Sequence, residues 1–445
     1  MGFLRHVRET FILSIPIIIG HLGHMMMAVT DNVMVGRIGS VSLAAAGLSN
    51  VLFFLILVMG LGISVAITPL VAQAHGAGEM KECGLVLRQG LIVTLVSGLV
   101  LFLITLVLAD SLDYLDQPQA VVESAKVYMR ILGFSIFPMM VFQSYKQFAE
   151  GLSITKSAMV ITLLANIVNV FANWIFIFGH LGAPAMGLAG AGLGTLLSRV
   201  FMAVAMAVVV MKSPYLKTFD PFGSRFQIHV VMIKKLLRIG IPAGFQYVFE
   251  VSSFAGASVL TGWIGTKELA AHQIALNLSS ISYMFSLGVS AAATVRVGTT
   301  FGKKDIRGTR MAGFAAIALI CLFMIFFATT FICFRSVFPS FYISEKDVIV
   351  IAAQILVIAG VFQVSDGIQA VSAGMLRGVM DVNIPTVITF TAYWVIGIPV
   401  GYVLGIRMHY GVTGVWIGLL TGLTASAVMM LVRFHLINRS GRPDL

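Results

Sequence analysis

Charged side chains are scarce in this sequence. Lys, Arg, Asp and Glu make up 11% of its 445 residues, whereas a soluble globular domain carries about 25%. Hydrophobic residues account for 58%, above the roughly 45–50% that is usual for soluble domains. This composition excludes an ordinary soluble domain and predicts an integral membrane protein with many spans.

Cysteine is also scarce, and the sequence lacks the motifs of common soluble enzymes. Cys321 and Cys333 lie in one apolar segment and Cys83 lies in a distant loop, so we expect neither a disulfide framework nor a metal cluster. There is no P-loop, CxxC or HExxH motif, so ATP is not expected to be the direct energy source. We therefore expect no enzymatic activity and no bound cofactor.

Long apolar runs are what the sequence has instead. A helix needs roughly 20 mostly apolar residues to cross a bilayer. Twelve such runs predict an all-α integral membrane protein with twelve transmembrane helices. Their approximate limits are Phe11–Val35, Leu48–Ala72, Leu87–Leu108, Val127–Gln147, Ala158–Phe178, Leu188–Met211, Ile239–Leu260, Gln273–Gly298, Met311–Phe334, Val348–Leu376, Ile384–Gly405 and Val412–Leu431.

The basic residues are distributed unevenly between the two ends of these runs. With the N-terminus inside, the inner segments hold about three times as many Lys and Arg residues as the outer ones, as the positive-inside rule requires. The net charge of +11 therefore indicates orientation in a membrane rather than binding to nucleic acid. We expect a multi-pass protein of the cell inner membrane with both termini in the cytoplasm.

The second half of the sequence repeats the first. When Pro16 is aligned with Pro242, an offset of 226 residues, the small residues that alternate over 62–68 meet those over 288–294. Each half has six predicted spans, an even number, so the repeats are parallel and related by an axis along the membrane normal. We predict an N-terminal six-helix lobe (1–211), a cytoplasmic linker (212–238) and a C-terminal six-helix lobe (239–445), related by a pseudo-two-fold.

Three carboxylates fall within predicted spans, namely Asp31, Glu250 and Asp366. A charge at the bilayer centre costs roughly 2.5–3.5 kcal/mol on insertion scales, and such residues mark ion or substrate pathways. A purely structural carboxylate would be protonated or paired, and Arg199 is the basic residue that we place deep in a span. The repeat shows that these charges are asymmetric, because Glu250 aligns with His24.

Glu250 and Asp366 are the strongest candidates for a cation site. Glu250 lies near the middle of its span, and Asp366 about one turn from the middle of its own. A buried carboxylate can carry a proton, or it can hold Na⁺ together with a second carboxylate and oxygens from Gln246, Ser252 or Ser253. Asp31 lies nearer the outer end of the first span, where simple hydration also explains a carboxylate.

Polar and aromatic side chains accompany these carboxylates. Tyr247 and Phe254 share a helix face with Glu250, and Tyr283 lies in the middle of the eighth span. Rings near carboxylates suit a lipophilic cation, although ordinary packing against lipid also explains them. Asn169 and Asn173 are four residues apart, and we expect them to form hydrogen bonds between helices.

Several motifs together resemble the MATE (multidrug and toxic compound extrusion) transporter family, and its NorM-like branch most closely. They are VTDNVMVG, FEVSSF, AAHQIALN, ATVRVG and DGIQAVSAGMLRG. The resemblance extends over essentially the whole chain. It implies two six-helix lobes and the efflux of cationic amphiphiles against the entry of Na⁺ or H⁺.

The resemblance also implies roles for individual residues. Cation binding is implied for Glu250, Asp366, Asp31 and Tyr283, with Glu250 and Asp366 as the ligands if the ion is Na⁺. Substrate contact is implied for Asp31, Phe254, Gln273, Tyr283 and Glu345. The chain departs from some NorM-like members at Phe362, where they have a tyrosine, so one oxygen of the cation site is missing.

The sequence thus predicts a secondary antiporter, with two alternatives left open. We expect a monomer in contact with lipid that exports small cationic organic compounds, with Na⁺ or H⁺ as the coupling ion. A lipid-linked oligosaccharide flippase of related architecture would need a cationic groove for pyrophosphate. A membrane scaffold without transport would have no use for carboxylates in the middle of the membrane.

Overall fold

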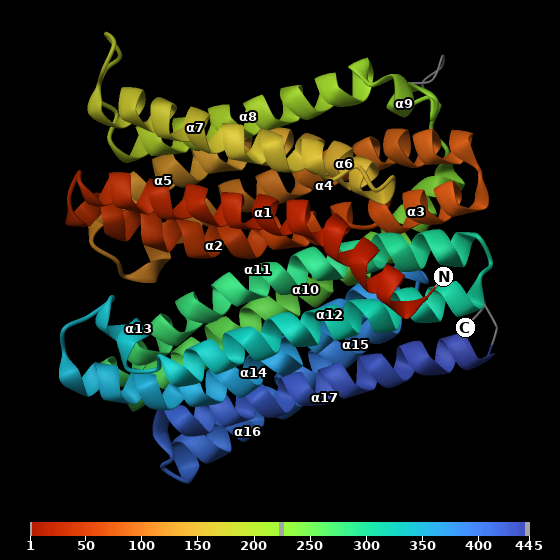
Figure 1. Cartoon of the computed structure of the whole chain (residues 1–445). Helices are drawn as coiled ribbons and strands as arrows, with labels where there is room; N and C mark the ends of the chain where they lie inside the picture. The colour runs from red at the N-terminus through yellow and green to blue at the C-terminus, as the bar shows by residue number, and fades with distance from the viewer. Residues whose placement is uncertain (1, 222–226, 441–445) are drawn as a thin grey trace. The chain divides into compact units, whose positions relative to one another are not determined.

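The computed structural model describes residues 2–221 and 227–440, and all regular secondary structure within these ranges is helical. Figure 1 shows the helices coloured in chain order. Those of the first half are α1 (Phe3–Gly36), α2 (Ser40–Ser64), α3 (Ile67–Ala77), α4 (Met80–Asp110), the 3-10 turn η1 (Ser111–Leu115), α5 (Gln119–Phe134), α6 (Ile136–Gly151), α7 (Lys156–Phe178), α8 (Leu188–Lys212) and the short α9 (Pro214–Lys217).

The second half has the same succession of long helices. They are α10 (Val230–Ile264), α11 (Thr266–Gly302), α12 (Ile306–Cys333), the short α13 (Val337–Ser340), α14 (Lys346–Gly378), α15 (Asn383–Phe390), α16 (Ile398–Tyr402) and α17 (Gly411–Ser440). Two π-helical segments, η2 (Thr391–Gly397) and η3 (Val403–Arg407), flank α16, so that residues 383–407 form one continuous span.

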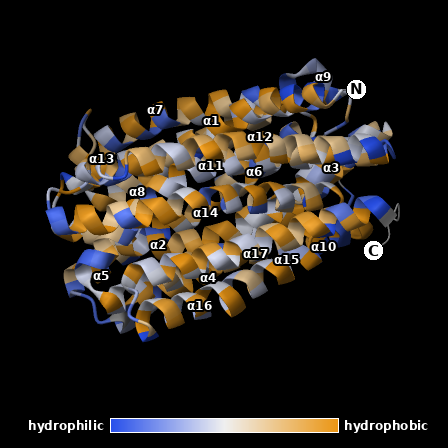
Figure 2. Cartoon of the chain, turned by 60° about the horizontal axis from the view of Figure 1, so that its bottom comes forward, coloured by the Kyte–Doolittle hydropathy of each residue, from blue (hydrophilic) through white to orange (hydrophobic). Residues whose placement is uncertain are grey.

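The prediction of an all-α membrane protein is confirmed. Among the described residues, eleven helical segments are long and apolar enough to cross a bilayer, with α2–α3 and α5–α6 each counting as one. The predicted seventh span lies within α10, which has sufficient length at 35 residues but is less apolar because it carries Glu250 and many small residues. Figure 2 shows hydrophobic residues along the helices and hydrophilic ones gathered toward their ends.

The chain folds into two compact units whose limits differ from the predicted lobes. One unit runs from Ile19 to Gly244, and the other combines the chain up to Ile18 with the chain from Phe245 onward. The helices α1 and α10 therefore each begin in one unit and end in the other. Part of the predicted linker also belongs to α10, which begins at Val230. Ile18 and Gly244 are themselves related by the repeat offset.

Proline and glycine account for these crossings. Pro16 and Pro242 lie inside α1 and α10, two residues before each unit boundary, where the missing backbone N–H weakens the helix. The start of α10 packs on α2 at Gly62, where a Cβ atom would clash with the backbone of Gly244. In the other unit a Cβ atom on Gly288 would clash with Ile18. These repeat-related glycines explain the alternating small residues.

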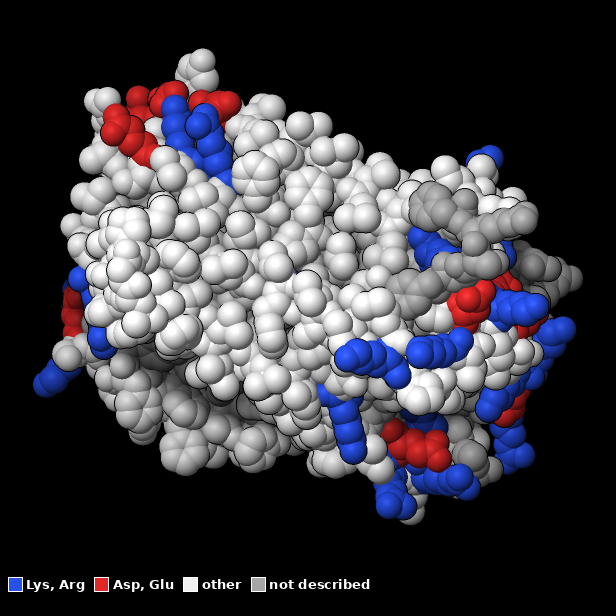
Figure 3. All heavy atoms as spheres, turned by 90° about the horizontal axis from the view of Figure 1, so that it is seen from above, with Lys and Arg blue, Asp and Glu red and all other residues white. Residues whose placement is uncertain are grey.

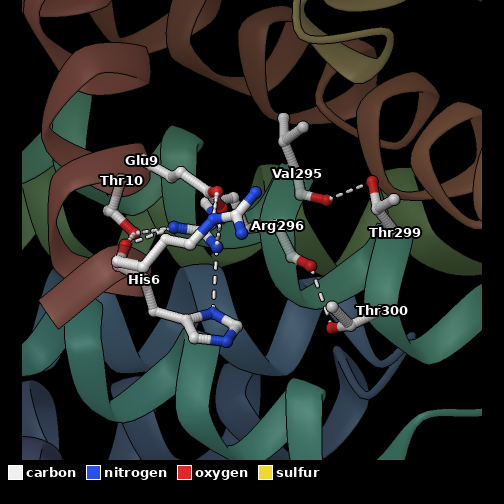
Figure 4. A network of polar contacts seen from close by, with 8 residues as sticks. His6, Glu9, Thr10, Val295, Arg296, Thr299 and Thr300 are labelled. Carbon is white, nitrogen blue, oxygen red and sulfur yellow. Dashed lines mark hydrogen bonds and ion pairs between the residues drawn. The ribbon is translucent and has the colours of Figure 1, made fainter. Parts of the chain in front are cut away.

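Polar contacts hold the first turns of α1 on α11 (Figure 4). The guanidinium group of Arg296 donates to Glu9 Oε2 at 2.8 Å, to Thr10 Oγ1 at 3.0 Å and to the backbone oxygen of His6. The Arg296 side chain is only 11% exposed, so these charge-assisted bonds replace the water that it loses. They explain why this segment belongs to the unit that contains the second half of the chain.

Glycines also bring α17 close to the span over 383–407. A Cβ atom on Gly418 would clash with the backbone of Gly401, and one on Gly414 would lie 2.5 Å from the backbone nitrogen of Gly405. Helix association in membranes relies on such small residues, because lipid is as apolar as the side chains. This close contact fixes the last two spans against each other.

We expect Gly418→Ala to destabilise the protein, because the added methyl group must displace the backbone of Gly401. Overpacking of this kind costs about 1–3 kcal/mol and lowers the unfolding temperature in detergent. The matched control is Gly47→Ala, which adds the same methyl group to a helix where nothing lies within 4 Å. Equal unfolding temperatures for the two variants would contradict this account of the packing.

Candidate functional site

Glu250 lies on α10 inside the unit that contains the second half of the chain. Its side chain is 6% exposed, and its Oε1 accepts a hydrogen bond of 2.8 Å from the hydroxyl of Tyr283 on α11. No Lys, Arg or His side chain in the described chain forms an ion pair with it. The structure thus brings together two of the predicted site residues and leaves the carboxylate without an ion pair.

Asp366 lies on α14, which packs against α11. It is 3% exposed, and its carboxylate has no hydrogen bond or ion pair within the described ranges. It is close enough to Glu250 for the two carboxylates to interact electrostatically. Two buried acidic groups of like charge repel each other, and a bound cation relieves that repulsion.

Side-chain oxygen atoms that have no hydrogen-bond partner are buried in the same unit. The Oε1 atom of Gln246, one helical turn before Glu250, has no hydrogen-bond partner, and neither has the hydroxyl of Tyr393 on η2. Tyr393 is completely buried and interacts electrostatically with Glu250 and Asp366. Hard cations prefer oxygen ligands, so these atoms fit a small cation better than a purely structural role.

The predicted serine oxygens have another use. Ser253 Oγ donates to the backbone oxygen of Glu250 at 2.7 Å, and Ser252 Oγ donates to that of Phe249 at 3.3 Å. Such bonds to the preceding helical turn satisfy a hydroxyl locally. Of the three residues expected to supply oxygen ligands to Na⁺, Gln246 is the one whose side-chain oxygen has no hydrogen-bond partner.

Aromatic rings form an apolar wall beside the carboxylates. The ring of Phe254 lies 6.1 Å from the rings of both Phe362 and Tyr393, and Phe362 lies 5.5 Å from Trp416. Phe362 is 3% exposed and is part of the hydrophobic core. The hydroxyl that a tyrosine would supply at that position is absent, whereas Tyr393 places one in the same core.

Asp31 belongs to a separate cluster in the other unit. Its Oδ1 accepts from Asn173 Nδ2 on α7 at 2.6 Å, and its Oδ2 accepts from Thr195 Oγ1 on α8 at 3.1 Å. Asn173 Nδ2 also donates to Asn169 at 3.3 Å. The expected hydrogen bond between helices is confirmed for Asn173, whose partner is Asp31, 8% exposed. The hydrogen bond between Asn169 and Asn173 lies within α7.

Gly194 makes room for this cluster. A Cβ atom there would clash with Asn173 Oδ1, so only glycine lets α8 approach the amide that binds Asp31. The Nδ2 atom of Asn169 and the Oδ1 atom of Asn173 are buried without partners. The cluster therefore has unused hydrogen-bonding capacity next to a carboxylate, as a site for a proton or a polar ligand needs.

The last two predicted substrate residues lie near the helix ends, away from the buried carboxylates. Gln273 is exposed and donates to Ser258 Oγ at 3.5 Å. Glu345, in the loop before α14, forms a salt bridge of 3.3 Å with Lys267, which also binds Asp347. The structure does not bring these two residues together with Glu250.

Sequence reasoning missed several buried polar residues. Arg377, the residue after the predicted span Val348–Leu376, is 6% exposed on α14, donates to Tyr247 Oη and Ser290 Oγ, and interacts electrostatically with Glu250. Lys146 is also buried, 3.7 Å from Glu150. The sequence did contain a signal, because each of these two basic residues lies within or beside an apolar run. The exact residue at which a run leaves the membrane could not be predicted, so their burial was missed.

Comparisons with known proteins agree with this architecture. A profile of the MatE family matches residues 16–175 and 242–403, and the two matches begin 226 residues apart (242 minus 16). The multidrug resistance protein NorM of Photobacterium profundum is 31% identical over 440 residues, which cover 98% of this chain and 96% of that protein. The NorM protein of Aliivibrio fischeri is 31% identical over 432 residues, with 96% and 94% covered.

Solved structures share the fold. The crystal structure of a eukaryotic MATE transporter has a TM-score of 0.89 at 20% identity, with 99% of each chain covered. An outward-facing multidrug resistance transporter of the MATE family has a TM-score of 0.89 at 22% identity, with 98% of this chain and 96% of that one covered. The arrangement of helices is therefore that of MATE structures.

A double-mutant cycle tests the Asp31 cluster. We expect Gly194→Ala to destabilise the protein because it displaces the Asn173 amide from Asp31. In Asp31→Asn the carboxylate is already lost, so the added methyl group should cost less, with a coupling of about 0.5–3 kcal/mol between the two changes. The measurement is thermal unfolding of the two single variants and the double variant, and strictly additive effects would contradict the coupling.

Proposed function

The chain belongs to the MatE family, whose profile matches both of its halves, and we propose that it exports cationic amphiphilic compounds in exchange for Na⁺ or H⁺. At the coarser level it is a multidrug efflux transporter and a multi-pass membrane protein, not an enzyme. The coupling ion and the class of drug are the parts that we propose. The relatives' names concern multidrug resistance and do not specify either part.

The buried carboxylate pair of Glu250 and Asp366 carries this proposal. Both groups are buried in protein, neither forms an ion pair within the described ranges, and they interact electrostatically. A buried charge without a partner is costly, so the pair is more stable when it shares a proton or holds Na⁺. The hydroxyl of Tyr283 and the free Oε1 atom of Gln246 supply further oxygens.

Coupling follows if drug and cation compete for this negative charge. An external cation that binds to the pair lowers its negative charge and so weakens the attraction for a cationic drug, which then leaves. Release of the ion to the inside restores the attraction. The membrane potential contributes roughly 2.3 kcal/mol per charge per 100 mV. Exchange of one monovalent ion for one monovalent drug moves no net charge, so the concentration gradient of the ion must drive it.

Aromatic side chains beside the pair support an amphiphilic cation as substrate. The ring of Phe254 lies 6.1 Å from the ring of Phe362 and 6.1 Å from that of Tyr393. These rings offer apolar and π surfaces. Tyr283 donates a hydrogen bond to Glu250 and is also a candidate for contact with the substrate. For Asp31, Gln273 and Glu345, contact with substrate stays a proposal from family resemblance.

The Lys and Arg bias supports the proposed orientation, with both termini in the cytoplasm and the protein in the inner membrane. In this orientation the linker between the halves faces the cytoplasm. We propose that the chain acts as a monomer, since each of the two clusters, around Glu250 and around Asp31, is assembled from residues of one chain.

We expect Glu250→Gln and Asp366→Asn each to abolish cation-driven efflux while the protein still inserts and folds. The measurement is ethidium transport by the purified protein in liposomes, with Na⁺ and pH gradients imposed separately. The matched control is Glu123→Gln, which neutralises an exposed carboxylate near the start of α5. Dye export by either site variant at the wild-type rate would refute the proposed role of the pair.

The two gradients also separate the coupling ions. If Na⁺ is the ion, an inward Na⁺ gradient at equal pH drives efflux, and Na⁺ protects the wild type but not Glu250→Gln against thermal unfolding. If H⁺ is the ion, the pH gradient alone suffices and Na⁺ gives no protection. Efflux that responds to neither gradient would remove secondary antiport as the mechanism.

A further inference from the structure

A basic pocket lies in the unit that runs from Ile19 to Gly244, and none of the carboxylates described above lines it. It has a volume of about 410 Å³ and lies between the first turns of α4 and the first turns of α10. Three permanent cations line it, Lys81 and Arg88 from α4 and Lys235 from α10, together with the carboxylate of Glu82. The lining is therefore positive overall, and the proposed transport cycle makes no use of it.

The walls of this pocket are held by specific contacts. The buried amide of Gln89 donates to the backbone oxygen of Gln227 at 2.8 Å and accepts from the backbone N–H of His229 at 3.0 Å. Arg88 Nη1 donates to the backbone oxygen of Asp220 at 2.6 Å. A Cβ atom on Gly84 would clash with the backbone of Phe219. Residues 219–220 and 227–229 are thus held along α4.

The cations are only weakly compensated. Lys81 has no ion-pair partner among residues 2–221 and 227–440, and the Lys235 ammonium lies 3.9 Å from Glu82 with its side chain 54% exposed. Arg88, which is 21% exposed, lies 3.4 Å from the carboxylate of Asp220, which is 62% exposed. Each pair has one partner that is more than half exposed, so it contributes little stability, and a stronger anion can replace its carboxylate. Phosphate is such an anion, because it accepts several charge-assisted hydrogen bonds at once.

The rim of the pocket is apolar. Val231, which lines it, is 62% exposed, and its neighbours Val230 and Ile228 are 57% and 64% exposed. Met80, next to the lining residue Lys81 at the start of α4, is 42% exposed. A free phosphate ion gains nothing from such a rim, whereas the acyl chains of a lipid cover it.

Figure 3 shows one face of the molecule, on which charged side chains lie toward the ends and the band between them is uncharged.

We propose that this pocket binds the phosphate of an anionic phospholipid, with Lys81, Arg88 and Lys235 around the headgroup and Val230 and Val231 against the acyl chains. Basic pockets at the ends of transmembrane helices recognise lipid headgroups in this way. The bound lipid would bridge α4 and α10 and so hold the start of α10 in its place. This inference does not depend on which ion drives transport.

The test uses the purified full-length chain in detergent and three probes, namely phosphatidylglycerol, phosphatidylcholine and inorganic phosphate. Native mass spectrometry measures the lipid retained, and thermal unfolding measures the stabilisation. The pocket variant combines Lys81→Gln and Lys235→Gln. The control combines Lys212→Gln and Lys234→Gln, two exposed lysines of the same unit that lie outside the pocket lining, so both variants lose the same charge.

We expect the wild type to retain phosphatidylglycerol and to unfold at a higher temperature with it than with phosphatidylcholine. The pocket variant should bind phosphatidylglycerol about 10–30-fold more weakly, since each Lys near an anionic surface contributes about a factor of five. The control should bind like the wild type. A variant with Lys81→Arg and Lys235→Arg should retain the lipid, which separates loss of charge from loss of folding.

Three outcomes would overturn the proposal. The first is equal weakening in the pocket variant and the control, which would show attraction to the general surface charge. The second is equal retention of phosphatidylglycerol and phosphatidylcholine by the wild type. The third is binding of inorganic phosphate as tight as that of the lipid and equally sensitive to the pocket variant, which would assign the pocket to free phosphate.

Discussion

An ionised carboxylate that is enclosed by protein has no bulk water to stabilise it, and this constraint shapes the interior of the unit that contains the second half of the chain. The carboxylates of Glu250 and Asp366 are buried, and within the described chain they accept a single hydrogen bond, from Tyr283. A purely structural role would require them to be protonated or paired with cations. Here the neighbouring Arg377 binds Tyr247 and Ser290 instead, which leaves the carboxylates available to an ion from outside.

The repeated sequence gives the two halves similar helical frames, and residues that differ between the two copies form the candidate sites. Gly62 and Gly288 have the same role in the two copies. The lack of a side chain at Gly62 lets α10 pack closely there, and the lack of one at Gly288 lets α1 pack closely there. Glu250, by contrast, has His24 as its counterpart in the first copy. Asp31 is held by Asn173 and Thr195 in its own unit, so the two units have different polar clusters on similar frames.

Much of the fold could be predicted from the sequence because apolar runs and their spacing reflect the thickness of the bilayer. The twelve runs follow from that constraint, whereas the repeat offset and the two halves follow from the residues that match between the two copies. The crossing of α1 and α10 between units could not be predicted, because Pro16 and Pro242 signal a weak point in a helix but not what each part packs against. The burial of Arg377, just beyond a predicted span, was missed for a similar reason, since an apolar run has no sharp end.

The sequence by itself determined the membrane class, the all-α fold, the repeat and the identity of the carboxylates, because each depends on composition or on order along the chain. Only the tertiary structure decided which oxygens meet those carboxylates. It joined Tyr283 to Glu250, left Gln246 and Tyr393 without partners, and placed Asp31 with Asn173. These are contacts between helices far apart in sequence, and they depend on how glycine and proline let the helices approach, which no single helix specifies.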